Sequence, residues 1–274
     1  MFKLALAQMR VVGGRAEENR HHAESFIQRA ADAGAAVVLL PEALDFGWTH
    51  SSARDGAGPI PGGATCERLR ECARHHRIFV CAGLVERDGD GLFNSAILAD
   101  PQGALLLHHR KLNELDIAHG VYAQGDRLAV ARTALGTIGV MICADAFARG
   151  QVVSRSLALM GADVILSPCA WAMPAGHDNV REPYGLLWLD SYGPVARDFS
   201  VWIAGCSNVG QLDDGPWAGR ECIGNSLVIA PDGSVAARGP FGVDAESLLL
   251  VDVAPVPRPA RGDGWEKVWL KRGA

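Results

Sequence analysis

Several short segments of the chain are apolar at almost every position rather than at every second one. They cover residues 3–9, 35–41, 78–84, 138–143, 162–168, 201–208 and 225–231. Strands that do not alternate are typical of sheets buried on both faces. Between them lie segments with apolar residues every three or four positions, at 16–34, 64–77, 150–161 and 183–198. This spacing predicts helices, and the alternation of strand and helix predicts an α/β fold with the helices outside.

Two strand pairs interrupt the alternation. Residues 84–100 contain a turn at Asp88–Gly91, and residues 226–239 contain one at Asp232-Gly233. Asp-Gly steps favour tight hairpins, so each pair adds antiparallel strands and makes the sheet mixed. No linker divides the chain, and we expect a single domain over residues 1–274. Its end, about 255–274, is rich in proline and glycine and is expected to form an arm on the surface or on a neighbouring subunit.

The composition is typical of a soluble globular protein, with 49% hydrophobic and 21% charged residues. A net charge of −5 without a long basic run argues against a nucleic-acid partner. No segment approaches the roughly 18 to 20 apolar residues of a membrane span, and the apolar N-terminal stretch is too short for a signal peptide. The seven cysteines are scattered without a C-x-x-C pair, which indicates reduced thiols in a cytoplasmic protein.

Three polar residues each follow an apolar run. Glu42 comes after "VVLLP", Lys111 after "ALLLHHR" and Cys143 after "GVMI". Ligands of open α/β sheets bind beyond the carboxyl ends of the strands, so these side chains are expected to converge on one site. Glu42 is suited to accept the thiol proton, while Lys111 and the Ala144 N–H are suited to stabilise an oxyanion. Taken singly, each residue has a structural alternative: a helix-capping glutamate, a solvated lysine and a packing thiol.

Longer stretches around these residues sharpen the prediction. "GAAVVLLPEAL", "HHRKLNELD" and "GTIGVMICADAF" resemble the glutamate, lysine and cysteine motifs of the nitrilase, or carbon–nitrogen hydrolase, superfamily. The resemblance implies that Glu42, Lys111 and Cys143 are the catalytic residues. It also implies a four-layer αββα sandwich of two mixed sheets, a homodimer or higher homo-oligomer, and a reaction through a thioester that needs no cofactor or metal.

The chain departs from the family pattern at two places. The residue after the cysteine is usually Tyr or Trp, whereas here it is Ala144, which leaves a space for other side chains or for substrate. The family's second glutamate, about eight residues past the lysine, is missing. Either His119 or Glu114 is expected to support the site in its place. The alternatives are an ordinary loop histidine and a local salt-bridge partner.

Four residues are expected to contact substrate because of their positions relative to the motifs: Trp48, Tyr122, Trp171 and Asn208. For a tryptophan, the alternative is a place in the core or in an interface. Cys169 lies where the family often has Ser or Thr, and it is expected to be a packing thiol rather than a second nucleophile.

The leading functional prediction is hydrolysis of a small linear amide or N-carbamoyl compound. The chain reads C-A-D where nitrilases often show C-W-E. A nitrilase that makes acid and ammonia is the alternative within the family. Ala144 and the missing second glutamate suggest another alternative, a degenerate acyl-binding member without catalysis. A metal-binding or redox protein is disfavoured, because the cysteines lack the spacing of metal ligands.

Overall fold

The computed structural model describes residues 1–256 and contains two six-stranded mixed sheets. The first sheet has the order β15 (Ser247–Val253), β1 (Phe2–Gln8), β2 (Val37–Leu39), β3 (Phe79–Asp88), β4 (Gly91–Ala99), β5 (Leu105–Arg110). The second has the order β14 (Val235–Arg238), β13 (Leu227–Ile229), β10 (Trp202–Ser207), β8 (Val164–Cys169), β7 (Gly136–Val140), β6 (Val130–Thr133). A small third sheet consists of β11 (Val209–Gln211), β12 (Arg220–Ile223) and β9 (Ala172–Pro174).

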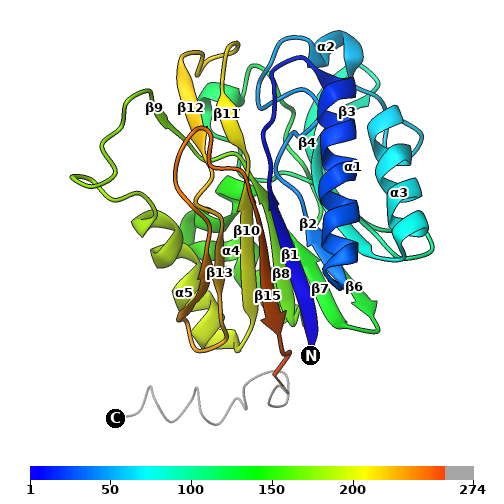
Figure 1. Ribbon diagram of the computed structural model, residues 1–274, viewed down its shortest axis with the longest axis vertical. Helices are drawn as coiled ribbons and strands as arrows, with labels where there is room; N and C mark the ends of the chain where they lie inside the picture. The colour runs from blue at the N-terminus through cyan, green and yellow to red at the C-terminus, as the bar shows by residue number, and fades with distance from the viewer. Residues whose placement is uncertain (257–274) are drawn as a thin grey trace, which may run out of the picture.

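Helices cover the outer faces of the two large sheets. The helices are α1 (Ala16–Asp32), α2 (Ala53–Gly56), α3 (Ala64–His76), α4 (Val152–Leu159) and α5 (Leu186–Phe199). Three short 3₁₀ turns are η1 (Asp116–Ala118), η2 (Cys143–Phe147) and η3 (Arg149–Gln151). In Figure 1, α1 and α3 lie on one side of the strands, and α4 and α5 lie on the other. The predicted α/β fold, an αββα sandwich of two mixed sheets, is therefore confirmed.

Burial on both faces explains the non-alternating apolar runs. On β1, Leu4 and Leu6 belong to the core between the two sheets, whereas Ala5 and Ala7 belong to the core under α1 and α3. Small alanines let the helices approach the sheet closely, and larger leucines fill the space between the sheets. A strand buried on both sides has no solvent-facing position, so the polar half of the usual alternation disappears.

The structure confirms both predicted hairpins and corrects two element boundaries. β3 pairs antiparallel with β4 up to Asp88 and Gly91, and β13 pairs antiparallel with β14. The predicted strand over 138–143 is wrong at its end, because β7 stops at Val140 and Cys143 begins a 3₁₀ turn instead. The predicted helix over 183–198 begins only at Leu186, after Gly185 with φ of 119°. Glycine adopts this positive φ readily, but a right-handed helix requires a negative φ, so the helix cannot include Gly185.

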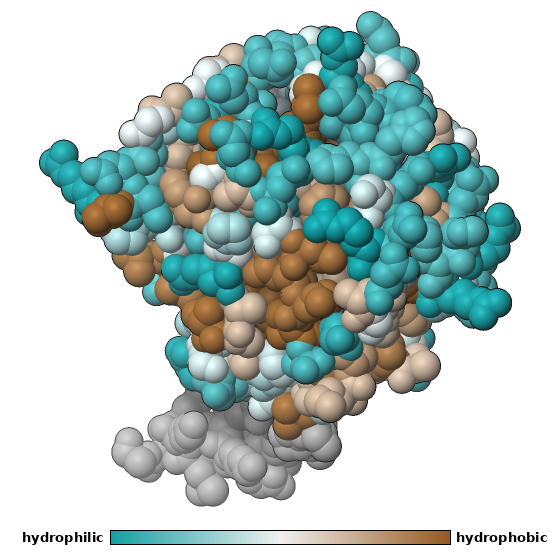
Figure 2. All heavy atoms as spheres, in the orientation of Figure 1, coloured by the Kyte–Doolittle hydropathy of each residue, from teal (hydrophilic) through white to brown (hydrophobic). Residues whose placement is uncertain are grey.

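The surface gives little further information about function. Figure 2 shows a mostly hydrophilic face with apolar side chains gathered near its centre. Leu250, on the edge strand β15, is 43% exposed. Among residues 1–256, no helix is long and apolar enough to cross a membrane. The predicted C-terminal arm at about 255–274 falls almost entirely outside the described residues.

Candidate active site

Glu42 lies in the irregular segment just beyond β2, between the two sheets. Its N–H donates to the Cys169 carbonyl at 3.2 Å, which ties it to the second sheet. Gly83 on β3 of the first sheet leaves room for the Glu42 backbone, because a Cβ there would lie 2.6 Å from the Glu42 Cα. The side chain is 1% exposed, and its Oε1 accepts hydrogen bonds from Asn94 Nδ2 at 2.6 Å and from Lys111 Nζ at 2.7 Å. The carboxylate is thus buried and held in place through Oε1, while Oε2 accepts neither of these two hydrogen bonds.

Lys111 follows the last residue of β5. Its N–H donates to the Asn94 carbonyl at 2.9 Å, and its own carbonyl accepts the Gly125 N–H at 2.8 Å. The side chain is only 2% exposed, and Nζ lies 3.5 Å from Glu114 Oε2 in addition to its contact with Glu42. Burial alone would lower the pKa of Lys111, but these two carboxylates raise it well above its ordinary value. The alternative of a solvated loop lysine is therefore wrong.

Cys143 begins the turn η2 with φ of +43°, a left-handed conformation that a non-glycine residue rarely adopts. Its N–H donates to Ser167 Oγ at 3.1 Å, which helps to hold the turn. Strained backbone of this kind clusters at active sites, where it presents a reactive side chain. Burial, a hydrogen bond with Cys169 and the charge of Glu42 raise the pKa of the thiol well above its ordinary value. The opposing effect of Lys111 is smaller, so the resting side chain is a neutral thiol.

Asp145 joins the cysteine turn to the lysine loop. Its Oδ1 accepts the N–H groups of Leu112 at 3.0 Å and Asn113 at 2.8 Å, both in the loop after Lys111. Its Oδ2 accepts the Ile142 N–H at 2.9 Å and His109 Nε2 at 2.8 Å. One buried carboxylate therefore sets the distance between the two motifs.

Sequence reasoning did not assign Asp145, His109 or Asn94 to the site. Asn94 holds both Glu42 and the Lys111 backbone, yet it looked like an ordinary residue of a hairpin strand. The available signal was its place beside Ser95 in β4, where two polar residues interrupt an otherwise apolar strand. Buried polar side chains in a strand interior need partners, and so they indicate a polar network.

Ala144 is 1% exposed, and Asn113 Nδ2 donates to its carbonyl at 2.6 Å. Protein atoms therefore cover the alanine itself, and Asn113 holds its carbonyl. Ser167 Oγ accepts the Cys143 N–H, and Asn113 Nδ2 donates to the Ala144 carbonyl. The backbone on both sides of the Cys143–Ala144 peptide is therefore held in place. Donation of the Ala144 N–H to an oxyanion stays a prediction, and the fixed peptide is compatible with it.

Of the two candidates for the missing glutamate, Glu114 and His119, only Glu114 reaches the lysine. Glu114 Oε2 lies 3.5 Å from Lys111 Nζ, and the Glu114 side chain is 3% exposed. The His119 side chain is 61% exposed, and its Nε2 lies 4.0 Å from Asp116 Oδ1. Glu114 is therefore a third buried ionisable group of the site, whereas His119 is exposed to solvent.

The four predicted substrate contacts lie in three different surroundings. Tyr122 is buried, accepts the Thr49 N–H at 2.9 Å, and lines a pocket of about 450 Å³ together with Glu114. Trp48 packs against Trp217 with ring centroids 5.0 Å apart, and Trp48 and Asn208 both line a separate shallow cleft. Trp171 is 2% exposed and stacks on Trp188 at 4.5 Å. Contact with substrate stays a prediction for all four.

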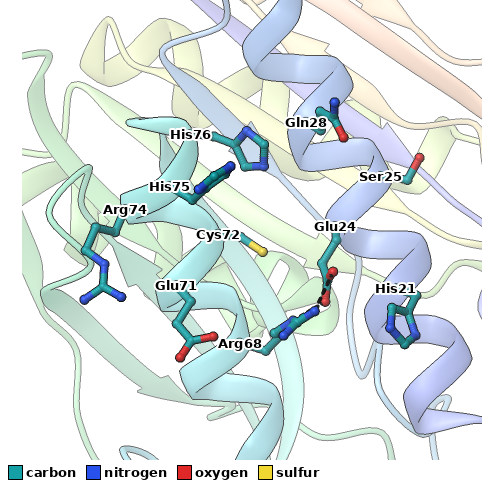
Figure 3. A pocket seen from close by; sticks show the side chains of 10 residues that line it. All are labelled: His21, Glu24, Ser25, Gln28, Arg68, Glu71, Cys72, Arg74, His75 and His76. Carbon is teal, nitrogen blue, oxygen red and sulfur yellow. Dashed lines mark hydrogen bonds and ion pairs between the residues drawn. The ribbon is translucent and has the colours of Figure 1, made fainter.

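Another groove lies on the outer helices and contains none of these residues. It measures about 660 Å³, and its lining comes from α1 and α3, with an ion pair between Arg68 and Glu24 (Figure 3). None of its lining residues is Glu42, Lys111 or Cys143, and none forms a hydrogen bond or ion pair with them, so this groove is not the candidate site. Within residues 1–256, no group of three or more His, Cys, Asp or Glu side chains is arranged to hold a metal ion.

Comparison with known proteins decides the family. The sequence model of the carbon–nitrogen hydrolases matches residues 3–256. The chain belongs to the carbon–nitrogen hydrolase family. The hydrolase is 35% identical to a nitrilase of Pyrococcus abyssi over 86% of its own chain and 84% of that protein. It is 30% identical to an omega-amidase of Danio rerio, over 92% and 88% of the two chains.

Solved structures agree with the fold of the hydrolase. An amidase from Nesterenkonia sp. AN1 superposes with a TM-score of 0.76 at 24% identity and covers 93% of both chains. Nit3 of Saccharomyces cerevisiae superposes with a TM-score of 0.77 at 23% identity, over 91% and 89% of the two chains. The arrangement of two mixed sheets with outer helices is thus that of nitrilase-superfamily amidases.

The substitution Glu114→Gln is expected to change how the stability of the hydrolase depends on pH. Burial raises the pKa of Glu114 to about 7. The unfolded chain releases this proton at a lower pH, so the wild type loses stability as the pH rises from about 4.5 to 7. Glutamine cannot ionise. The free energy of unfolding of the variant relative to that of the wild type should therefore increase by roughly 3 kcal/mol when the pH is raised from 4.5 to 8, as measured by urea unfolding. The exposed Glu71→Gln variant is the control, and an equal effect of Glu114→Gln at both pH values would refute the prediction.

Proposed function

We propose that the hydrolase cleaves the C–N bond of a small amide through a thioester on Cys143. The observation that carries the proposal is the buried ion pair of Lys111 and Glu42, 2.7 Å apart, in the immediate surroundings of a strained cysteine turn. Taking an ammonium and a carboxylate out of water costs several kcal/mol. Their presence beside a thiol supports catalytic use over packing, and it argues against a degenerate acyl-binding protein.

In the first half of the proposed reaction, Cys143 Sγ attacks the amide carbonyl carbon while Glu42 takes the thiol proton. Proton transfer during attack suits a thiol whose pKa lies well above its ordinary value, because no thiolate is present beforehand. The carbonyl oxygen becomes an oxyanion, which the Lys111 ammonium and the Ala144 N–H stabilise. Glu42 then gives its proton to the nitrogen, the C–N bond breaks, and ammonia or an amine leaves.

In the second half, water attacks the thioester carbonyl and Glu42 takes a proton from it. A second oxyanion forms at the same place and collapses to release the carboxylic acid, and the proton returns to the sulfur. Lys111 Nζ and Asn94 Nδ2 both contact Glu42 Oε1, which supports a role for the other oxygen, Oε2, as the atom that carries the proton. The same three side chains thus serve both halves.

The relatives support amide and nitrile substrates to different degrees. The Danio rerio relative is named an omega-amidase and the Pyrococcus abyssi relative a nitrilase. The sequence Cys143-Ala144-Asp145 lacks the tryptophan and glutamate that often follow a nitrilase cysteine, and this favours amides. We therefore place small linear amides and N-carbamoyl compounds first, with nitriles as the second candidate.

A substrate panel tests the proposal. Small linear amides, N-carbamoyl amino acids and the matching nitriles are incubated with the enzyme, and ammonia release is measured. We expect at least one amide or N-carbamoyl compound to exceed its nitrile by about 100-fold in kcat/KM, and intact-protein mass spectrometry to detect the acyl group on Cys143. Faster turnover of nitriles would establish the nitrilase alternative. Binding of amides without turnover would establish the acyl-binding alternative.

A further inference from the structure

The pocket that Glu114 lines is formed by a single segment of the chain. It measures about 450 Å³, and every residue that lines it comes from the segment 112–124, between β5 and β6. Its lining includes Glu114, Tyr122 and the exposed His119. Glu114 also lies 3.5 Å from Lys111 Nζ, so one residue of the pocket wall contacts the catalytic cluster.

The Glu114 carboxyl group has hydrogen-bonding capacity that the protein does not use. The residue is 8% exposed, and neither Oε1 nor Oε2 has a hydrogen-bond partner among residues 1–256. The 3.5 Å approach to Lys111 is long, and the short contact of the ammonium is with Glu42 at 2.7 Å. A buried carboxyl group without hydrogen bonds is costly, so a partner from outside the protein is the simplest explanation.

The charge of the cluster indicates what kind of partner this is. Glu42 and Glu114 are two acidic groups around one ammonium, that of Lys111. When both acids are ionised, the cluster has an excess negative charge in a poorly solvated place. An ammonium group on the substrate would balance this charge, whereas a carboxylate would add to it.

We propose that Glu114 is a specificity-determining residue that binds an ammonium group on the substrate, so that the hydrolase prefers amides with a short amino-bearing chain. This inference rests on the proposed amide hydrolysis. Glu42 and Glu114 contact the same Nζ atom, and so a donor on Glu114 lies close to the reacting carbonyl. The chain between amide and amine therefore has to be short.

The preference for amides with an ammonium group over neutral amides is expected to increase with pH. Burial raises the pKa of Glu114 to about 7, so it is only partly ionised at neutral pH. The groups that face it are Lys111, Glu42 and Asp145, with Tyr122 and His119 on the pocket wall. A primary amine stays protonated up to about pH 10, whereas the ionised fraction of Glu114 rises about tenfold between pH 6 and pH 8.5.

The experiment compares substrates of the same shape and different charge. These are 5-aminopentanamide, hexanamide and the monoamide of adipic acid, which are cationic, neutral and anionic. The ratio of kcat/KM for the cationic to the neutral amide is measured from pH 6 to pH 8.5. We expect a ratio of at least about 10 at pH 8.5, a rise with pH of up to tenfold, and the anionic amide as the slowest of the three. A ratio near 1, or one independent of pH, would overturn the inference even if all three amides are hydrolysed.

Three variants separate the contact with Glu114 from a general effect of negative charge in the loop. In Glu114→Gln the ratio should fall towards 1 and lose its pH dependence, whereas Glu114→Asp should retain the sign of the preference. Asp116→Asn removes a fully exposed charge from the same loop and should leave the ratio as in the wild type. A preference that survives in Glu114→Gln would overturn the assignment. If no amide is hydrolysed, the proposed function fails, and calorimetric binding of the same three amides to Cys143→Ala still decides the contact with Glu114.

Discussion

Replacement of Cys143 by alanine is expected to abolish ammonia release from every substrate of the hydrolase. Alanine removes the nucleophile while the surrounding buried charges stay in place. Loss of a nucleophile in a cooperative catalytic set typically costs about 10⁴-fold or more, which would bring the rate to background. The measurement is steady-state ammonia release with the best substrate of the panel.

Companion variants test whether the three residues act as one unit. Glu42→Gln and Lys111→Ala should each cause a loss of similar size, and combining either with Cys143→Ala should add almost nothing, because such sets are strongly non-additive. Cys66→Ala is the matched control, since Cys66 is also buried but belongs to α3, outside the site. If Cys143→Ala kept more than about 1% of the wild-type rate, a thioester mechanism would be untenable.

Replacement of Asp145 by alanine is expected to destabilise the fold by roughly 4 kcal/mol, the largest stability effect of any single change at the site. The substitution leaves three backbone N–H groups and His109 without their acceptor; two of these four hydrogen bonds are fully buried and two are partly buried. Each orphaned donor costs about 1–3 kcal/mol, partly relieved by local relaxation. Urea unfolding at pH 7 measures the loss, and kcat should fall in conditions where the variant is still folded, because the lysine loop is no longer tied to the cysteine turn.

The exposed Asp198→Ala variant controls for the loss of an aspartate. Asp198 pairs with Arg155 at the surface, and its removal should cost less than about 1 kcal/mol. Burial alone would raise the pKa of Asp145, but its hydrogen bond with His109 and the backbone donors lower it. Its ionised form thus contributes stability above the ordinary aspartate pKa, and this contribution disappears as the pH falls below that value. A loss for Asp145→Ala no larger than that for Asp198→Ala would show that the network is dispensable.

The parts of the fold that follow from local chemistry could be predicted from the sequence. The apolar runs located the buried strands, and the Asp-Gly turn after Asp88 located the hairpin of β3 and β4. The three predicted catalytic residues do lie in one buried neighbourhood, because strands of a sandwich end at a common edge. The positive φ at Cys143 could not be predicted, since the Cys143 N–H is held by Ser167, which lies on β8, far along the chain.

Side-chain direction was the part that the sequence left undetermined. Glu114 and His119 are both polar loop residues near Lys111, and only the path of the loop turns one inwards and leaves the other exposed. The partners of Trp48 and Trp171 lie at Trp217 and Trp188, too far along the chain for any local pattern to relate them. Contacts of this kind depend on packing between elements, which spacing along one element does not encode.

The origin of the pocket wall in one continuous segment has a consequence for the evolution and engineering of this enzyme. The segment 112–124 forms the lining, while Glu42, Asn94 and Cys143 are held by other parts of the two sheets. Only its first residues, Leu112 and Asn113, are tied to the cysteine turn. Exchange or random variation of 115–124 leaves Glu114 and its contact with Lys111 in place, so a graft of this stretch is a natural unit for diversifying the pocket wall.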